Sequence, residues 1–439
     1  MKIPCTIFTG TLCLAVLFGS AAVGFSQRAF NLRLASTNNG VALSWPCQSA
    51  TPTNDFPLVP RFLVQRSVDL QSWTPISSNL TTLVGHTLTF TDTNAERAFY
   101  RVQSILNEQY AQLNGALLDS GSLTGADFFG AQLFGASLRE AFLAQAQFAG
   151  ADLRTADFSG ADLRGASLFA VFGSQATFDT ATLTNADCSF ADFEAASFFN
   201  VDLTGADFRS AILHNADFDF AVLKDVKLDD NTVLDPKPKL IWQIINQGAT
   251  NTLLTNLDLS FGVFTGASFH GANLSGSELA GADLRDTDLR GVNFTNADLR
   301  FADFRGAQMD DTTVIDSKSR LVWQILNQNA GVGADLHGVD LTAVLLFGAD
   351  FTGANLTNAI CTSFICESAN FGGANLTLAN CSGGDFTGAT LTNANLTQVN
   401  FSSADLTDAN LLNATITGAS FIGTTFSHTI MPDGSIRNF

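Results

Sequence analysis

Residues 151–165 read Ala-Asp-Leu-Arg-Thr, Ala-Asp-Phe-Ser-Gly, Ala-Asp-Leu-Arg-Gly, and this five-residue unit decides the fold. From Leu113 to Leu228 the same frame recurs through 24 consecutive units, and it resumes over residues 254–309 and 336–426. A period of five fits neither a helix nor a strand, because apolar residues at that spacing would bury no continuous face. The sequence therefore predicts a repeat solenoid in which the chain turns a corner every five residues.

The length of one coil follows from the step at which residue types repeat. At a step of 20, phenylalanines form one ladder and leucines form others. A step of 20 predicts four five-residue sides per coil. In each unit the central residue and the alanine two positions before it should point inward, and the other three outward, so that small and large side chains fill a narrow core. The phenylalanine ladder comprises Phe158, Phe178, Phe198 and Phe218.

Units such as Ala151–Thr155 and Ala161–Gly165 resemble the pentapeptide-repeat family. The resemblance covers about residues 111–428 and implies an all-β fold, a right-handed quadrilateral β-helix. Its coils would stack about 4.8 Å apart, the usual spacing of neighbouring strands. Gly173 departs from the pattern because it occupies a central position. A glycine there predicts a local bulge or a thin spot in the core.

The N-terminal residues 1–26 predict a secretory signal peptide. Lys2 precedes an apolar run over residues 7–23, and Gly24 and Ser26 are small enough for a cleavage site. The apolar run is too short to favour a membrane anchor. We expect an exported bacterial protein, periplasmic, cell-surface or extracellular, with no membrane span after cleavage.

Residues 27–106 follow a different pattern, with short alternating or aromatic runs such as Val41–Trp45, Phe62–Arg66 and Ala98–Val102. Turn-forming residues separate these runs, which is typical of a small antiparallel β-sandwich. The segment resembles a fibronectin-type-III-like domain found in exported bacterial proteins. That resemblance implies a module that spaces or attaches other domains.

Two segments that interrupt the repeats are copies of each other at an offset of 81 residues. Each has an aspartate followed by apolar residues at helical spacing, which predicts a helix of about three turns. Its apolar face should cover the open end of a neighbouring coil, and Trp242 and Trp323 should pack beneath it. Hinges and caps are both open roles. The predicted order is repeat block 1 (107–231), helical insertion (232–250), block 2 (251–312), helical insertion (313–331), block 3 (332–428) and closing turn (429–439).

The formal charge of −19 arises mostly from aspartates at outward positions. An acidic surface keeps the chain soluble and argues against direct nucleic-acid binding. The pentapeptide-repeat resemblance also implies an alternative, a DNA mimic that inhibits a topoisomerase or another nucleic-acid-binding protein. The predicted signal peptide counts against that alternative.

No residue pattern predicts catalysis, and we assign no catalytic, cofactor-binding or metal-binding residue and no cofactor. The histidines are scattered, and the filled core offers no pocket for a substrate. Cys188, Cys361, Cys366 and Cys381 fall on central inward positions. Cys361 and Cys381 lie 20 residues apart and should stack, so that buried free thiols, a disulfide or a metal site are all open.

Arg285 and Arg305 fall on one ladder beside Asp283 and Asp303. They predict a surface ion-pair lattice or, alternatively, a recognition strip for an acidic partner. The sequence as a whole favours an exported, non-enzymatic binding or structural protein that presents an acidic, rigid solenoid surface to a protein or cell-surface partner. Its oligomeric state is not predicted.

Overall fold

A computed structural model describes residues 111–438 in full and, before them, the backbone of six strands. The predicted signal peptide, residues 1–26, lies outside the described residues. The chain divides into two compact units, Met1–Asp235 and Pro236–Phe439. Neither helix among the described residues is long and apolar enough to cross a bilayer.

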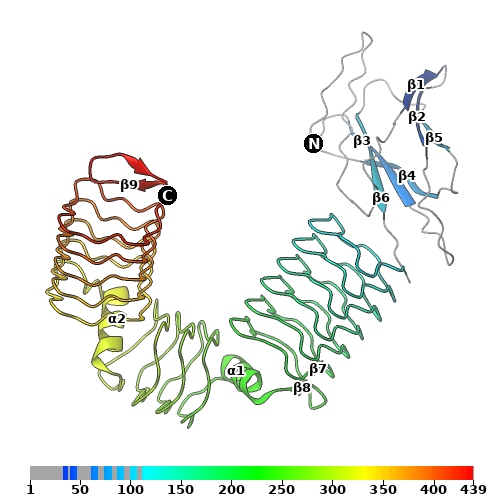
Figure 1. The fold of residues 1–439 in the computed structure, drawn as a ribbon. Helices are drawn as coiled ribbons and strands as arrows, with labels where there is room; N and C mark the ends of the chain where they lie inside the picture. The colour runs from blue at the N-terminus through cyan, green and yellow to red at the C-terminus, as the bar shows by residue number, and fades with distance from the viewer. Residues whose placement is uncertain are drawn as a thin grey trace. The chain divides into compact units, whose positions relative to one another are not determined.

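The six N-terminal strands form two three-stranded antiparallel sheets, in the orders β1-β2-β5 and β4-β3-β6 (Figure 1). Strands β2, β3 and β6 overlap the predicted runs Val41–Trp45, Phe62–Arg66 and Ala98–Val102. The sequence does not predict β4, because its residues, Thr-Pro-Ile-Ser-Ser-Asn-Leu-Thr, lack a clear apolar alternation. The strands are β1 (Arg33–Thr37), β2 (Gly40–Pro46), β3 (Arg61–Ser67), β4 (Thr74–Thr81), β5 (Thr87–Asp92) and β6 (Phe99–Ile105).

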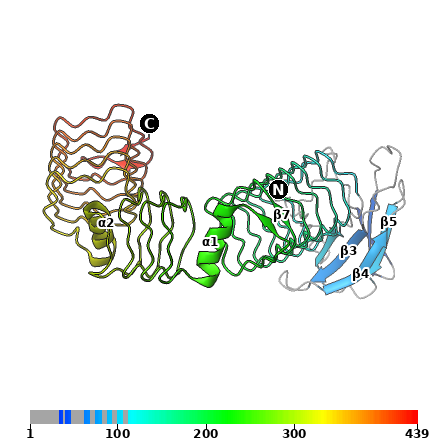
Figure 2. The same ribbon diagram turned by 90° about the horizontal axis from the view of Figure 1, so that it is seen from below.

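From residue 111 the chain winds as a solenoid whose coils are visible in both ribbon views (Figures 1 and 2). In most units the residue before the centre makes a parallel bridge to the residue 20 positions later, as in Asp152↔Phe172. The amide of Leu153 donates to the carbonyl oxygen of Phe172 at 2.7 Å. The repeated offset of 20 confirms four sides per coil and makes the fold a β-solenoid.

The corners explain why glycine and asparagine are so common at the last position of the unit. The amide of Ala156 donates to the carbonyl oxygen of Leu153 at 2.9 Å and closes a β-turn. The second turn residue has a positive φ, 57° at Thr155 and 68° at Gly160. That left-handed conformation suits glycine, and after it asparagine and aspartate. Each corner therefore favours, at the last position of the five-residue unit, residues that tolerate a positive φ.

The core consists of the central side chains and the alanines, as the sequence predicts. Phe158, Phe178 and Phe198 are fully buried and stack coil upon coil with ring centroids 5.1 Å apart. Phe193 meets Phe178 edge-on at 5.5 Å. Stacked and edge-on pairs both suit the charge distribution of aromatic rings. The narrow core is thus filled by interlocking rings.

The structure shows that the predicted bulge or thin spot at Gly173 is wrong. The ladder passes through this coil without interruption, since Phe172 bridges both Asp152 and Asp192. A Cβ atom on Gly173 would lie 2.5 Å from Cδ1 of Phe193. The ring from the next coil occupies the space that a central leucine would fill, so glycine is required by packing.

The two duplicated segments each contain a helix of 12 residues, α1 (Pro236–Gln247) and α2 (Ser317–Gln328). Asp316 caps α2 by accepting the amide hydrogen of Ser319 at 3.0 Å. Trp323 is buried and donates its indole hydrogen to the carbonyl oxygen of Ala307 at 2.7 Å. Trp323 therefore packs beneath its helix. The remaining strands are β7 (Ile212–Leu213), β8 (Val233–Leu234), β9 (Thr429–Ile430) and β10 (Ile436–Arg437).

Candidate interaction surface

The outward aspartates and asparagines hold the corners of the coils. The carboxylate of Asp157 accepts the amide hydrogen of Ser159 at 2.9 Å, and the amide oxygen of Asn375 accepts that of Thr377 at 3.1 Å. The same contact recurs along the solenoid, always between the residue before the centre and the residue after it. The acidic rows are therefore part of the corner structure and not only a solvated face.

Arginine at the position after the centre adds a second contact to this motif. In Asp298–Arg300 the guanidinium meets the carboxylate through Nε at 2.9 Å and Nη2 at 2.6 Å. Hydrogen bonds from this guanidinium hold the pKa of Asp298 below its usual value. The guanidinium is largely exposed, so solvent screens the pair and it contributes little to stability. Block 2 contains four such arginines, Arg285, Arg290, Arg300 and Arg305.

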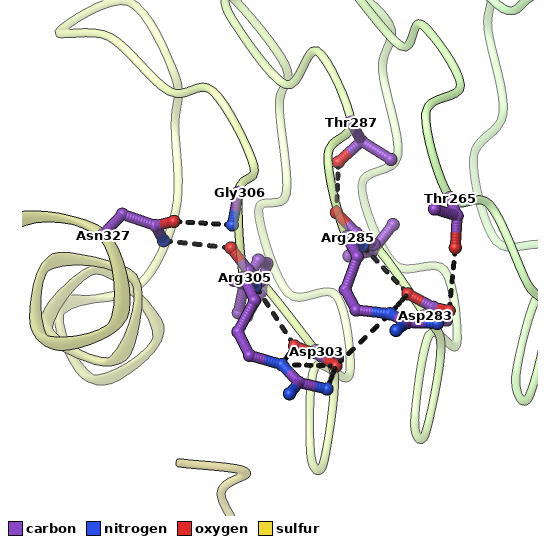
Figure 3. A network of polar contacts seen from close by, with 10 residues as sticks. Thr265, Asp283, Arg285, Thr287, Asp303, Arg305, Gly306 and Asn327 are labelled. Carbon is purple, nitrogen blue, oxygen red and sulfur yellow. Dashed lines mark hydrogen bonds and ion pairs between the residues drawn. The ribbon is translucent and has the colours of Figure 1, made fainter. Parts of the chain in front are cut away.

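Arg285 and Arg305 belong to a polar network that links neighbouring coils (Figure 3). Nε of Arg285 lies 3.7 Å from Asp303, and the hydroxyl of Thr265 donates to Asp283 at 2.8 Å. Burial raises the pKa of Asp283, but hydrogen bonds from Arg285 and Thr265 outweigh burial and lower the pKa overall. These contacts form the ion-pair lattice that the sequence predicts as one of two interpretations.

Helix α2 is fixed to the end of this network. The amide group of Asn327 donates to the carbonyl oxygen of Phe304 at 3.0 Å and accepts the amide hydrogen of Gly306 at 2.7 Å (Figure 3). Two-sided hydrogen bonding of this kind satisfies backbone groups at the last coil of block 2. No local sequence pattern points to Asn327, because the residues that it contacts lie more than 20 positions away in the chain.

Cationic side chains on the walls recur between a carboxylate and a phenylalanine ring. The guanidinium of Arg154 pairs with Asp152 at 2.6 Å and lies 5.8 Å from the ring centroid of Phe134. Arg305 lies in the same way between Asp303 and the ring of Phe347, at 4.9 Å. The attraction of a cation for a ring face adds to the ion pair.

Lys237 repeats this arrangement in a different part of the chain. Its ammonium lies 3.6 Å from Asp258 and 5.6 Å from the ring centroid of Phe261. Together with the two arginines, it shows that the walls accommodate a cation wherever a carboxylate and a phenylalanine ring adjoin.

The cysteines at central positions are buried and free. Burial raises the pKa of the Cys188 and Cys366 thiols far above their usual value, which makes them poor nucleophiles at neutral pH. A hydrogen bond with Cys361 is the main cause of the raised pKa of Cys381. Over the part of the chain that the structure describes, no group of three His, Cys, Asp or Glu residues is arranged to hold a metal ion.

The described histidines lie on the outer walls, and three of them adjoin a single aspartate each. Nδ1 of His214 lies 2.9 Å from Asp235, whereas the corresponding distances are 3.8 Å for His270 with Asp288 and 3.7 Å for His428 with Asp408. The structure brings no two of these histidines together, and His86 lies outside the described residues.

The family model described as Pentapeptide repeats (8 copies) matches more than half of the chain. The matched residues are 131–168, 192–230, 250–279, 277–313, 333–363, 364–393 and 394–431. The chain therefore belongs to the pentapeptide-repeat family. A comparison with curated proteins found no match.

Three solved structures illustrate the likeness. A pentapeptide repeat protein, Rfr23, from the cyanobacterium Cyanothece 51142 is 29% identical, with 23% of this chain and 64% of that chain covered and a TM-score of 0.16. HetL, involved in heterocyst differentiation regulation in Nostoc sp. strain PCC 7120, is 23% identical, covering 72% and 94% with a TM-score of 0.14. A trypsin-treated form of QnrB1, a plasmid-mediated fluoroquinolone resistance protein, is 19% identical, covering 44% and 89% with a TM-score of 0.21. The family assignment depends on the repeat itself, since these TM-scores are low.

Proposed function

We propose that this protein is a non-enzymatic binding or structural protein whose solenoid offers its outer walls to a protein partner. The closed core is the observation that carries the proposal. Central side chains such as Phe178, Leu183 and Phe351 are fully buried. A ligand must therefore engage the walls, and stacked coils provide the flat, rigid surfaces that repeat proteins use for binding.

We further propose that the protein is exported and carries its repeats behind a fibronectin-type-III-like module. The lysine and apolar run of residues 1–26 support export. The strand orders β1-β2-β5 and β4-β3-β6 support the module, because the first, second and fifth strands of such sandwiches share one sheet. A net charge of −19 supports an acidic outer surface.

Export and binding can be tested separately. We would fuse residues 1–30 to a phosphatase that is active only outside the cytoplasm, and an inactive fusion would contradict export. We would then cross-link the full chain in its own source and identify the covalent partners by mass spectrometry. A saturable protein partner supports a binding role. Recovery only as part of a surface layer or matrix supports a structural role.

The walls offer less support to the DNA-mimic alternative. Many outward aspartates already accept hydrogen bonds from the corner backbone, and four of those in block 2 also pair with arginine. Pairing reduces the free negative charge that would imitate a phosphate row. Inhibition of DNA relaxation by a topoisomerase in the presence of residues 27–439 would favour the alternative, whereas unchanged relaxation would remove it.

A further inference from the structure

Exposed apolar side chains in block 1 are concentrated on one wall. Of the ten large apolar residues that are exposed between residues 111 and 235, seven lie on the side of the coils that carries the ladder Asp152, Phe172, Asp192, Ile212, Val233 or at its two corners. The opposite wall with its corners has two, Phe142 and Phe199. We call this side the aromatic wall. Its exposed apolar residues are Phe129, Phe134, Phe169, Phe172, Phe190, Ile212 and Val233.

The centre of the aromatic wall is continuous. The rings of Phe169 and Phe190, from successive coils, have centroids 5.6 Å apart. Phe169 and Phe190 stand at the same corner of successive coils, and Phe172, which is 56% exposed, lies on the wall beside that corner. A contiguous apolar patch on a soluble protein marks an interaction site more often than isolated exposed residues do.

Folding does not explain these rings. Phe190 is 62% exposed and adopts a φ of 59°, a conformation that disfavours bulky side chains. Phe172 points outward, while the space inside it is filled by Phe193. Bulky residues kept in unfavourable conformations at the surface are found at functional sites.

Two acidic groups on the aromatic wall, Asp192 and Glu194, lack the cation that other carboxylates of the walls have. Asp192 follows Phe172 on the same ladder, and Glu194 lies at the next corner, where its amide donates to Asp192 at 3.1 Å. Among the described residues, no basic side chain pairs with either carboxylate. By contrast, Arg154 on this same wall lies between Asp152 and the ring of Phe134.

We propose that the aromatic wall binds an amphipathic polypeptide segment in which Lys or Arg adjoins apolar residues. The apolar residues would cover Phe169, Phe172 and Phe190, and the basic residue would take the place between ring and carboxylate beside Asp192 and Glu194. Carboxylates on the wall disfavour anionic lipids and nucleic acids. This inference rests on the proposed function, because it names the wall and the class of partner.

The test selects a display library of random peptides against residues 27–439 and measures the affinity of the enriched peptides by fluorescence polarisation. The first variant, Phe172→Ser with Phe190→Asn, removes two rings, and asparagine tolerates the positive φ at position 190. The second, Asp192→Asn with Glu194→Gln, removes the charges. The matched control, Leu117→Ser with Phe142→Ser, removes two exposed apolar residues from other walls. Thermal unfolding verifies that all three variants fold.

We expect enriched peptides to combine Lys or Arg with apolar residues. Their affinity should fall at least about tenfold in the ring variant, the size of effect typical of central aromatic contacts. The charge variant should weaken binding about threefold to tenfold and flatten its salt dependence. The control should stay within about twofold, since surface substitutions away from a contact have small effects.

Several outcomes would overturn the inference. Peptides without an excess of Lys or Arg, or with affinity unchanged in the ring variant, show that the wall is not the site, although peptide binding elsewhere leaves the proposed function intact. If no peptide is enriched, the result contradicts both the inference about the wall and the proposed function. Self-association of the chain in light scattering that the ring variant abolishes identifies a second copy as the occupant.

Discussion

Blocks 2 and 3 build the same coil with different wall chemistry. In block 2 the corners combine aspartate with arginine, as in Asp298–Arg300. In block 3, residues 332–428 contain no lysine or arginine. There the corners combine asparagine or aspartate with threonine, and Thr377 donates both its amide and its hydroxyl to Asn375, at 3.1 and 2.7 Å.

The two blocks also link neighbouring coils by different groups. In block 3 the Asn375 side-chain amide donates to the hydroxyl of Thr357 in the preceding coil at 3.0 Å, whereas in block 2 Arg285 reaches Asp303 in the next coil at 3.7 Å. The shared requirement is a side-chain oxygen that accepts the corner amide. Charge can therefore vary between blocks without a change of fold, which leaves it available for recognition.

The largest effect should be common to both blocks, because it concerns the core. Leu284 and Leu376 are both fully buried. We expect Leu284→Ala and Leu376→Ala each to lower the free energy of unfolding of their block by about 2 to 5 kcal/mol. Hydrogen exchange of the two blocks, followed peptide by peptide, measures this. Tolerance of either substitution would contradict equal core packing.

The second-largest loss of stability should follow removal of the side-chain oxygen that accepts a corner amide hydrogen. Asp303 accepts the Arg305 amide at 3.1 Å and is nearly buried. Asp303→Ala should cost about 1.5 to 3 kcal/mol, as hydrogen bonds to charged groups do, and Asn375→Ala about 0.5 to 1.5 kcal/mol. Asp303→Asn is the matched control, since it keeps an acceptor. Urea unfolding should place it between wild type and Asp303→Ala. An equal loss for both substitutions at 303 would show that charge, not the acceptor, holds the corner.

Low pH should destabilise block 2 before block 3, with a smaller effect than the substitutions above. Hydrogen bonds from Arg290 and Arg300 lower the pKa values of Asp288 and Asp298 in the folded chain. A lowered folded pKa gives a stabilisation that is present above the unfolded value of about 4 and is lost as the pH falls through the folded values. Hydrogen exchange corrected for intrinsic rates should show block 2 losing protection in this range before the coils held by Asn355, Asn375 and Asn395. If both sets of coils lose protection at the same pH, the two blocks do not differ in acid stability.

Salt should have the smallest effect. Screening by about 1 M NaCl weakens exposed ion pairs, and each such pair contributes little to stability even without added salt. Exchange in block 2 should rise slightly at the coils of Arg290 and Arg300, with block 3 unchanged. A larger rise in block 3 than in block 2 would show that the arginine–aspartate pairs are not what salt weakens.

The sequence predicted the coil length and the inward residues because stacked positions share an environment, as the ladder through Phe178 illustrates. It failed at Gly173, where the missing side chain is supplied by Phe193 from the next coil. It also missed β4, whose polar residues do not alternate. In both cases the deciding contact comes from a residue outside the local pattern.

The candidate surface was only partly predictable. The pairing of Arg285 and Arg305 with aspartates followed from their ladder, since two-residue spacing places both groups on one corner. The aromatic wall was missed, although Phe172 and Ile212 break the polar rule at outward positions. Counting apolar residues at outward positions by wall would have found it once the coil length was known.

By itself, the sequence determined the period of five, the 20-residue coil and the membership of the inward set, because a periodic fold repeats one local environment along the chain. Tertiary structure alone decided which exposed residues adjoin. Phe169 and Phe190 lie 21 positions apart in the chain but 5.6 Å apart in space, because winding brings each corner onto the next. A recognition surface on this solenoid is a property of the stacked coils and not of any one repeat.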